Sequence, residues 1–189
     1  MEARRTGMRW TYAEFARLPS EGGTRNEIVA GELVVTPAPG VSHQRVVTSL
    51  AVHLELFVRA HEIGTVLVGP IDILFAEGDY LEPDLVVVLD RSAHLFSDRG
   101  IEGPPDLVVE VASPASAARD RGVKLERYRA YGVPEYWVVD PELRTIEVWR
   151  FAARATGPAV HPPGDVLEWD PGTGRAILEL KVDQVLRDR

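Results

Sequence analysis

Residues 106–140 read DLVVEVASPASAARDRGVKLERYRAYGVPEYWVVD. The stretch begins and ends with apolar runs, at 106–111 and 136–140, and such continuous runs are typical of strands covered on both faces. Between them, Ser113-Pro114 predicts a helix start, because proline is favoured at the first helical position, and Gly132 predicts the helix end. This strand, helix, strand order predicts a right-handed crossover and therefore a mixed α/β fold.

A long helix and further strands are predicted on either side of this unit. The apolar residues from Val46 to Val58 recur with a helical period and predict a helix that Ser42 caps and Gly64 ends. Apolar and β-prone runs predict strands at 26–29, 32–35, 65–68, 71–75, 84–89, 145–150, 166–169 and 176–181. The first two and the last two of these strands each predict a hairpin. Residues 152–164, rich in Pro, Gly and Ala, predict a surface loop.

The composition limits both the class of protein and its chemistry. A length of 189 residues predicts one domain, and 45% hydrophobic with 26% charged residues exclude a disordered or fibrous chain. The absence of cysteine excludes disulfides and thiolate chemistry and leaves oxygen and imidazole as metal ligands. No apolar run is long enough to span a membrane and no apolar signal segment follows the first basic residues, so we expect a cytoplasmic protein without membrane contact.

The charge of the chain bears on nucleic-acid binding. A net charge of −8 repels a polyanion over most of the surface, so a nucleic acid would need a local basic patch. The helix predicted before Gly132 has such a patch, with a local charge of +3 on a mostly acidic protein. An ordinary solvent-exposed helix face would show the same charge.

Two acidic residues lie where apolar strands are predicted. Asp84 heads the run LVVVL, and Glu110 lies between Val109 and Val111. A carboxylate in such a place is costly unless it is paired or bound to a metal. Taken alone, Asp84 could cap a strand start and Glu110 could form a structural salt bridge; taken together, the two acids could share a cation.

Lys124 is the third candidate. Asp120, Lys124 and Tyr128 have the spacing of one helical face, on a helix that must fold back over the strand carrying Glu110. Lys124 and Lys181 are the only lysines among 21 basic residues. A surface pair with Asp120 would not require lysine, whereas a compact ammonium with a tunable pKa differs from a guanidinium. A role for Lys124 beside the two acids is therefore the sharper hypothesis.

Glu27 and His43 are further candidates with weaker support. Glu27 lies in the first hairpin strand, where an exposed acid is unremarkable, and His43 lies one turn before the apolar stripe of the long helix and faces inward. Structural roles for both stay open. Two converging carboxylates and an ammonium suit metal-dependent phosphodiester hydrolysis: the acids hold Mg²⁺ or Mn²⁺, and the lysine stabilises charge that develops in the transition state.

Several motifs occur in a fixed order along the chain. They are Glu82-Pro83-Asp84-Leu85, Glu110-Val111-Ala112-Ser113-Pro114, Asp120-Arg121 with Lys124, Tyr128, and the stretch from Gly132 to Asp140. This ordered set resembles the Uma-two (Uma2) family of restriction-endonuclease-like proteins, within the PD-(D/E)xK nuclease superfamily. The similarity runs from Asn26 through His43 to about Trp149.

The resemblance implies a restriction-endonuclease-like α/β fold, with a mixed sheet of five or more strands flanked by helices and extra terminal hairpins. It implies one domain over 1–189, with a nuclease core at about 26–150 and a hairpin extension at 151–189.

The resemblance also implies a set of site residues. The implied metal ligands are Asp84, Glu110 and the backbone carbonyl of Val111, with Mg²⁺ or Mn²⁺ as the cofactor. One position departs from the superfamily pattern, which places lysine two residues after the acid, where this chain has Ala112. Members of the family resemble one another in a lysine on the following helix, so Lys124 takes this role. Glu27 and His43 match upstream family positions as auxiliary ligands or substrate contacts.

Three functional hypotheses follow from these residues. The first is a divalent-metal-dependent DNA endonuclease, and because many nucleases of this class cut two strands as dimers, the terminal hairpin is a candidate homodimer contact. The second is a catalytically inactive nuclease-like module that binds nucleic acid or a protein partner. The third takes Glu110 and Lys124 as a buried structural ion pair, which is weak support for stability.

Overall fold

The strand, helix, strand unit forms the centre of the structure, a computed structural model that describes residues 10–18, 24–76, 78–151 and 157–187. Strands β9 (Leu107–Val111) and β10 (Glu135–Asp140) pair in parallel. Parallel neighbours need a crossover connection, and here the intervening chain folds as helices on one face of the sheet.

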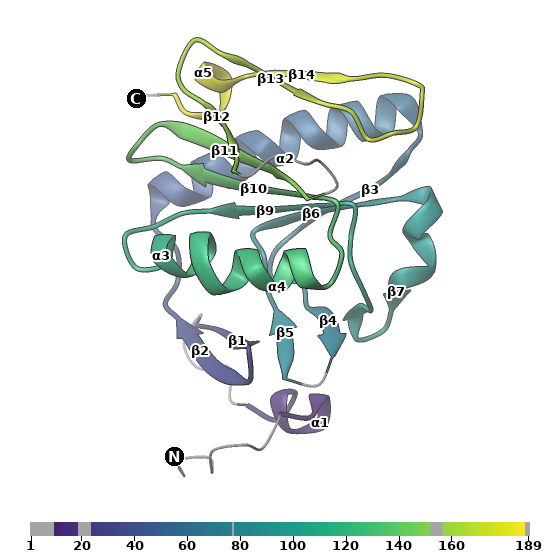
Figure 1. The fold of residues 1–189 in the computed structure, drawn as a ribbon, viewed down its shortest axis with the longest axis vertical. Coiled ribbons are helices and arrows are strands. Elements are labelled where there is room, and N and C mark those ends of the chain that lie inside the picture. The colour runs from purple at the N-terminus through teal and green to yellow at the C-terminus, as the bar shows by residue number, and fades with distance from the viewer. Residues whose placement is uncertain (1–9, 19–23, 77, 152–156, 188–189) are drawn as a thin grey trace.

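This unit lies in the middle of a six-stranded sheet with the order β12-β11-β10-β9-β6-β3 (Figure 1). The pairs other than β9 with β10 are antiparallel, so the predicted mixed sheet is confirmed. The other strands of this sheet are β3 (Gly64–Val68), β6 (Leu85–Leu89), β11 (Thr145–Arg150) and β12 (Ala159–His161). Every residue of β6, β9 and β10 is buried, as their apolar runs predicted.

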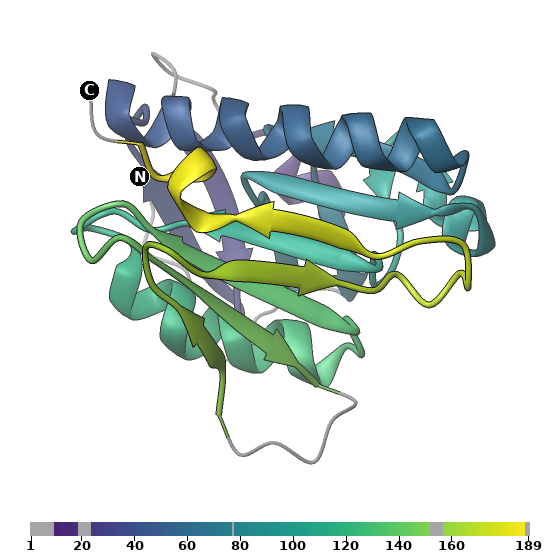
Figure 2. The same cartoon turned by 90° about the horizontal axis from the view of Figure 1, so that it is seen from above.

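Helices cover both faces of the central sheet (Figure 2). Helix α2 (Val41–His61) packs its apolar stripe on one face, against residues such as Val87 and Val109. The other face carries α3 (Ala117–Arg119), a turn η2 (Asp120–Lys124) that is kinked at Gly122, and α4 (Leu125–Ala130). Val86 and Val108 pack on this side, so neighbouring residues of one strand face opposite helices.

A second six-stranded sheet has the order β2-β1-β5-β4-β8-β7 and lies below the first in Figure 1. Its strands are β1 (Arg25–Val29), β2 (Glu32–Thr36), β4 (Ile73–Ala76), β5 (Asp79–Leu81), β7 (Phe96–Ser97) and β8 (Gly100–Ile101). The 3₁₀ helix η1 (Asp90–Leu95) leads into β7, and the short helix α1 (Tyr12–Phe15) packs its Phe15 on Tyr80 of β5. The sequence predicted the β1–β2 hairpin and β4, but not β5, β7 or β8, which are too short to show a period.

The end of the described chain covers α2. Strands β13 (Val166–Trp169) and β14 (Leu178–Lys181) form the predicted terminal hairpin, and α5 (Val182–Val185), which was not predicted, follows. Trp169 contacts the rings of Phe57 and Trp137. The hairpin therefore shares the hydrophobic core of α2 and the central sheet.

The predicted boundaries of α2 were wrong at both ends. Gly40, not Ser42, is the N-cap, and its extended backbone makes no side-chain capping bond. The helix ends at His61, because Glu62 adopts a left-handed conformation with φ 49°. Gly64 instead belongs to β3, where a side chain would meet the backbone of Val88 at 2.4 Å. Its glycine reflects close strand packing and not a helix end.

Two other predictions also need correction. Ser113-Pro114 does not start the crossover helix, which begins at Ala117, because Ser113 and Ser116 bond to each other's backbone and hold a turn. Within the predicted loop at 152–164, Ala159–His161 forms β12 on the edge of the central sheet. Residues 152–156 of that loop lie outside the described residues.

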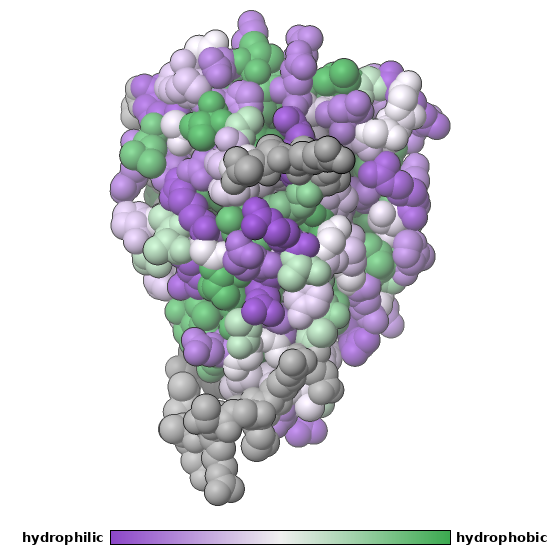
Figure 3. Space-filling view, in the orientation of Figure 1, coloured by the Kyte–Doolittle hydropathy of each residue, from purple (hydrophilic) through white to green (hydrophobic). Residues whose placement is uncertain are grey.

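The helices and the surface of the described residues were compared with what a membrane span requires. In the described ranges, none of the helices combines the length and the apolar character needed for a membrane span. Figure 3 shows hydrophilic and hydrophobic residues interspersed over the face that carries α3 and α4. This face therefore shows no single large apolar patch.

Candidate active site

Asp84 and Glu110 stand side by side on the face of the central sheet that α4 covers. Leu85 of β6 pairs with Val109 of β9, so Asp84 and Glu110 occupy the next positions on two adjacent strands. Both share the side of the sheet that carries Val86 and Val108, because side chains alternate along a strand. Both carboxyl groups are buried, with 3% of each residue exposed.

The carboxylate of Asp84 is held by three donors from three segments. Arg25 Nη2 donates to Oδ1 at 2.9 Å. His43 Nε2 lies 3.1 Å from Oδ2, and the backbone N–H of Val111 donates to the same oxygen at 2.8 Å. Burial opposes ionisation, but His43, Arg25 and the Val111 N–H outweigh it and lower the pKa of Asp84. Asp84 is therefore a fixed negative charge.

Lys124 joins Glu110 to Glu27. Its Nζ lies 2.7 Å from Glu110 Oε1 and 2.6 Å from Glu27 Oε1. Tyr128 O–H donates to the same oxygen of Glu110 at 2.8 Å, and the backbone N–H of Glu82 donates to Glu27 at 2.9 Å. The predicted helical face of Lys124 and Tyr128 over Glu110 is thus present.

In this cluster the buried carboxyl groups outnumber the arginine and lysine side chains that contact them. Glu27, Asp84, Glu110 and Asp120 are all buried. Arg25 contacts Asp84, and Lys124 contacts Glu27 and Glu110. Burial opposes the charge of Lys124, but the surrounding carboxylates outweigh this effect and raise its pKa, so the ammonium is retained. Burial also raises the pKa of Glu110 to about 8, against the opposing effect of Lys124. An added cation would favour the ionised form of Glu110.

The cluster is open to a pocket of about 280 Å³. The pocket is lined by the side chains of Glu27, His43, Asp84, Glu110, Lys124 and Asp120, together with Arg25 and Arg119. Val111 also lines it. The residues predicted from the sequence as catalytic or metal-binding therefore meet at one pocket.

The donors in this pocket suit a hard divalent cation in chemistry and in charge. Carboxylate and carbonyl oxygens are the ligands that Mg²⁺ and Mn²⁺ prefer, and Mg²⁺ commonly uses one or two carboxylates with waters. A surplus of buried carboxylates calls for positive charge. Within the described ranges, no three His, Asp or Glu side chains are already arranged as a metal cluster. A cation in this pocket would compete with the contacts that Arg25, His43 and Lys124 make to the carboxylates.

Some residues of the pocket were not among the sequence candidates. Arg25 contacts Asp84 across 59 positions of the chain, and no local pattern marks such a partner. The sequence predicts Asp120 on the helical face of Lys124 but gives it no separate role. In the structure, burial raises the pKa of Asp120. Arg119 lines the pocket, and its buried Nε has no hydrogen-bond partner among the described residues. The only sequence feature that pointed to Arg119 was its position in a basic predicted helix.

The chain is similar to known proteins over most of its length. The sequence model of the family Uma2, described as "Putative restriction endonuclease", matches residues 12–179. The protein sll1609 of Synechocystis sp. (strain ATCC 27184 / PCC 6803 / Kazusa), named as uncharacterized, is 25% identical over 134 residues, which are 69% of this chain and 74% of that protein.

A solved structure has the same fold. It is a crystal structure described as "a putative nuclease belonging to DUF820" from Anabaena variabilis ATCC 29413, and it superposes with a TM-score of 0.76 at 19% identity. The similarity covers 93% of this chain and 97% of that one. At this identity the likeness shows the fold, which agrees with the predicted restriction-endonuclease-like α/β architecture.

Proposed function

The chain belongs to the Uma2 family of restriction-endonuclease-like proteins, and from this membership we propose that it is a divalent-metal-dependent endonuclease that hydrolyses phosphodiester bonds in DNA. The family and the fold support a nuclease function in general. One observation carries the finer proposal: a single buried ammonium, Lys124, is shared by Glu27 and Glu110 beside Asp84 in an open pocket.

Asp84, Glu110 and the carbonyl of Val111 would hold the cation in this proposal. A bound Mg²⁺ or Mn²⁺ would polarise the phosphate and make a water molecule more acidic. His43 and Arg25 keep Asp84 ionised and oriented through their contacts with its two oxygens. Tyr128 orients Glu110 in the same way. The contacts of Arg25, His43 and Tyr128 thus hold the two proposed carboxylate ligands in place before a substrate arrives.

Lys124 supplies positive charge where a phosphate would gain negative charge. Its ammonium is held by two acids from β1 and β9, and its raised pKa keeps it protonated at neutral pH. A charge held in place in a buried site stabilises a transition state more than a mobile charge in water does. Lys124 on the helix would therefore take the role that the superfamily gives to a lysine on the strand, where this chain has Ala112.

A nuclease-like module without catalytic activity is the second candidate. The observation that favours it is the full engagement of Asp84, whose two oxygens already meet Arg25, His43 and the Val111 N–H. A cation must compete with these donors. Such a module would bind nucleic acid or a protein without cutting.

Cleavage of supercoiled plasmid DNA with Mg²⁺ or Mn²⁺ tests the first proposal. We expect nicked or linear product from the wild type, and at least about a hundredfold slower cleavage by Asp84→Asn, Glu110→Gln and Lys124→Met, because each removes a charge that acts in the transition state. Glu55→Gln, an exposed acid on α2, is the control and should cut normally. Circular dichroism confirms that each variant is folded.

Two results would contradict the nuclease proposal. Equal cleavage by the three variants would mean that a contaminant cuts the DNA. No cleavage by the wild type, with retention of DNA on a gel, would favour the inactive module. A thermal melt adds an independent readout, because Mn²⁺ should raise the melting temperature of the wild type and leave that of Glu110→Gln unchanged.

A further inference from the structure

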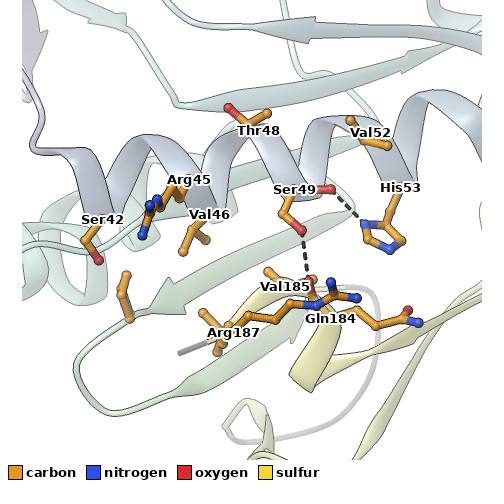
Figure 4. Close-up of a pocket in the computed structure, with 12 residues that line it drawn as sticks. Ser42, Arg45, Val46, Thr48, Ser49, Val52, His53, Gln184, Val185 and Arg187 are labelled. Atoms are coloured by element: carbon orange, nitrogen blue, oxygen red, sulfur yellow. Dashed lines mark hydrogen bonds between the residues drawn. The ribbon is translucent and has the colours of Figure 1, made fainter. Parts of the chain in front are cut away.

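A second pocket, of about 570 Å³, lies between α2 and the segment that contains α5 (Figure 4). The proposed chemistry does not use it. Arg45 from α2 and Arg187 from the chain after α5 both line it, and Figure 4 shows both side chains at this pocket. None of the lining residues in the described chain is acidic.

The two arginines of this pocket are not neutralised by other groups. Most arginines of the described chain contact a carboxylate, as Arg59 does with Glu55 and Arg91 does with Asp106. Among the residues with defined placement, neither Arg45 nor Arg187 has a hydrogen bond or an ion pair, although the chain as a whole carries a charge of −8. The pocket therefore gathers uncommitted positive charge on an acidic protein.

Two other polar side chains of this pocket, those of Ser49 and His53, bond to backbone carbonyls. Ser49 O–H donates to the carbonyl of Gln184 at 3.1 Å, which joins α2 to α5. His53 Nδ1 lies 2.7 Å from the carbonyl of Ser49, so Nδ1 carries the hydrogen, because a carbonyl only accepts. The walls of the pocket are thus ordered before a ligand binds.

This pocket and the candidate active-site pocket both adjoin a third hollow near the start of α2, with which each shares at least one lining residue. This third hollow is lined by Arg45 and Thr48, which also line the second pocket, and by Pro39, which also lines the active-site pocket. All three hollows are lined in part by residues of α2, and we refer to them together as the groove. From His43 to His53 the helix rises about 15 Å, and one DNA strand carries a phosphate for each 3.4 Å or so of helix axis. The groove is long enough for several phosphates.

We propose that this groove binds the sugar-phosphate backbone of DNA beside the cut bond, with Arg45 and Arg187 each neutralising a phosphate. The inference rests on the proposed function, because it assigns the path of the substrate away from the carboxylates. Two unpaired cations in the second pocket, whose lining residues in the described chain include no acid, provide the local basic patch that a polyanion requires on a protein of net charge −8. A guanidinium also matches a phosphate through two parallel hydrogen bonds.

The test is the binding of a fluorescently labelled DNA duplex, followed by anisotropy in EDTA so that no cleavage occurs. For Arg45→Ala with Arg187→Ala, we expect weaker binding and a plot of log K against log salt that is less steep by about 1.8, which corresponds to two lost phosphate contacts. The matched control is Arg59→Ala with Arg99→Ala, which removes the same charge from two exposed surface pairs. The control should keep the wild-type slope.

Three outcomes would overturn this inference. One is a slope of log K against log salt in Arg45→Ala with Arg187→Ala that equals the wild-type slope. Another is a change of this slope in the control variant as large as that in Arg45→Ala with Arg187→Ala. The third is a wild type that binds no duplex at low salt. If the first of these outcomes comes with conversion of a dimer to a monomer in sedimentation, the groove is a contact between copies of the chain. DNA binding is measured here without cleavage, so this experiment tests the groove separately from the proposed nuclease activity. DNA binding by the groove can be found even if the wild type cuts no DNA, and it can be absent even if the wild type cuts DNA.

Discussion

Lys124 shows what one residue contributes to this pocket. Its ammonium contacts acids from β1 and β9 at once, so it connects the second sheet to the central sheet as well as supplying charge. The scarcity of lysine and the spacing to Tyr128 made Lys124 predictable. Arg25 could not be predicted, because only the folded chain brings it to Asp84. The catalytic and metal-binding roles of Asp84, Glu110, Val111, Glu27, His43 and Lys124 stay predictions.

Glu82 gives a prediction about pH. Burial raises its pKa to about 7, and burial likewise raises the pKa of Asp72, its hydrogen-bond partner, to about 6. The folded state thus holds protons that the unfolded state releases near pH 4. The stabilising effect is complete below the unfolded pKa values and is lost as pH rises through about 6 to 7.

The measurement is the unfolding free energy by urea between pH 4.5 and 8, without divalent metal. We expect wild-type stability to fall over this range, and Glu82→Gln to reduce the slope, because the amide does not titrate. Glu126→Gln, an exposed acid on α4, is the control and should keep the wild-type slope. A wild-type stability that rises with pH in this window would refute the assignment.

At the scale of elements, the kinked turn η2 determines which side chains face the pocket. Asp120 and Lys124 begin and end this turn, and both are buried. The backbone is kinked between them, because Gly122 has non-helical dihedral angles (φ −113°, ψ −106°). No sequence signal predicted the kink, because a single glycine is tolerated within a helical pattern. Local hydroxyl bonds likewise shifted the helix start to Ala117, against the prediction from Ser113-Pro114.

Deletion of Val123 tests the role of this turn. Val123 is 37% exposed, so its loss removes little packing but shifts the register of the helix that follows the kink. Because one residue turns a helix by about 100°, either Asp120 or Lys124 must leave the pocket. We expect a folded protein with at least about a hundredfold slower cleavage. Val123→Ala keeps the register and should cut normally; equal loss in both variants would show that the side chain matters and not the turn.

At the scale of the whole molecule, the terminal hairpin completes the core. Leu167, Trp169, Leu178 and Leu180 are buried in the cluster that contains α2 and the central sheet. The hairpin itself was predictable from its alternating pattern, whereas its packing depends on distant partners such as Phe57. The division into a core at 26–150 and an extension at 151–189 remains a prediction.

Trp169→Ala measures how far the hairpin supports the whole fold. The indole is 2% exposed and contacts Phe57 and Trp137, so we expect a loss of about 3–5 kcal/mol in unfolding free energy, with one cooperative transition. Ile177→Ala, at a 54% exposed position just before β14, should change stability by less than about 0.5 kcal/mol. Two separate unfolding transitions in the wild type would show instead that the extension folds independently.

The order of the charged residues along the chain has a consequence during synthesis. The acids at 27, 84 and 110 leave the ribosome before the ammonium at 124 that two of them share. A nascent polypeptide that stops short of this lysine lacks the ammonium that Glu27 and Glu110 share. The candidate site would therefore form late, when the second half of the protein has been made and has folded back over the first.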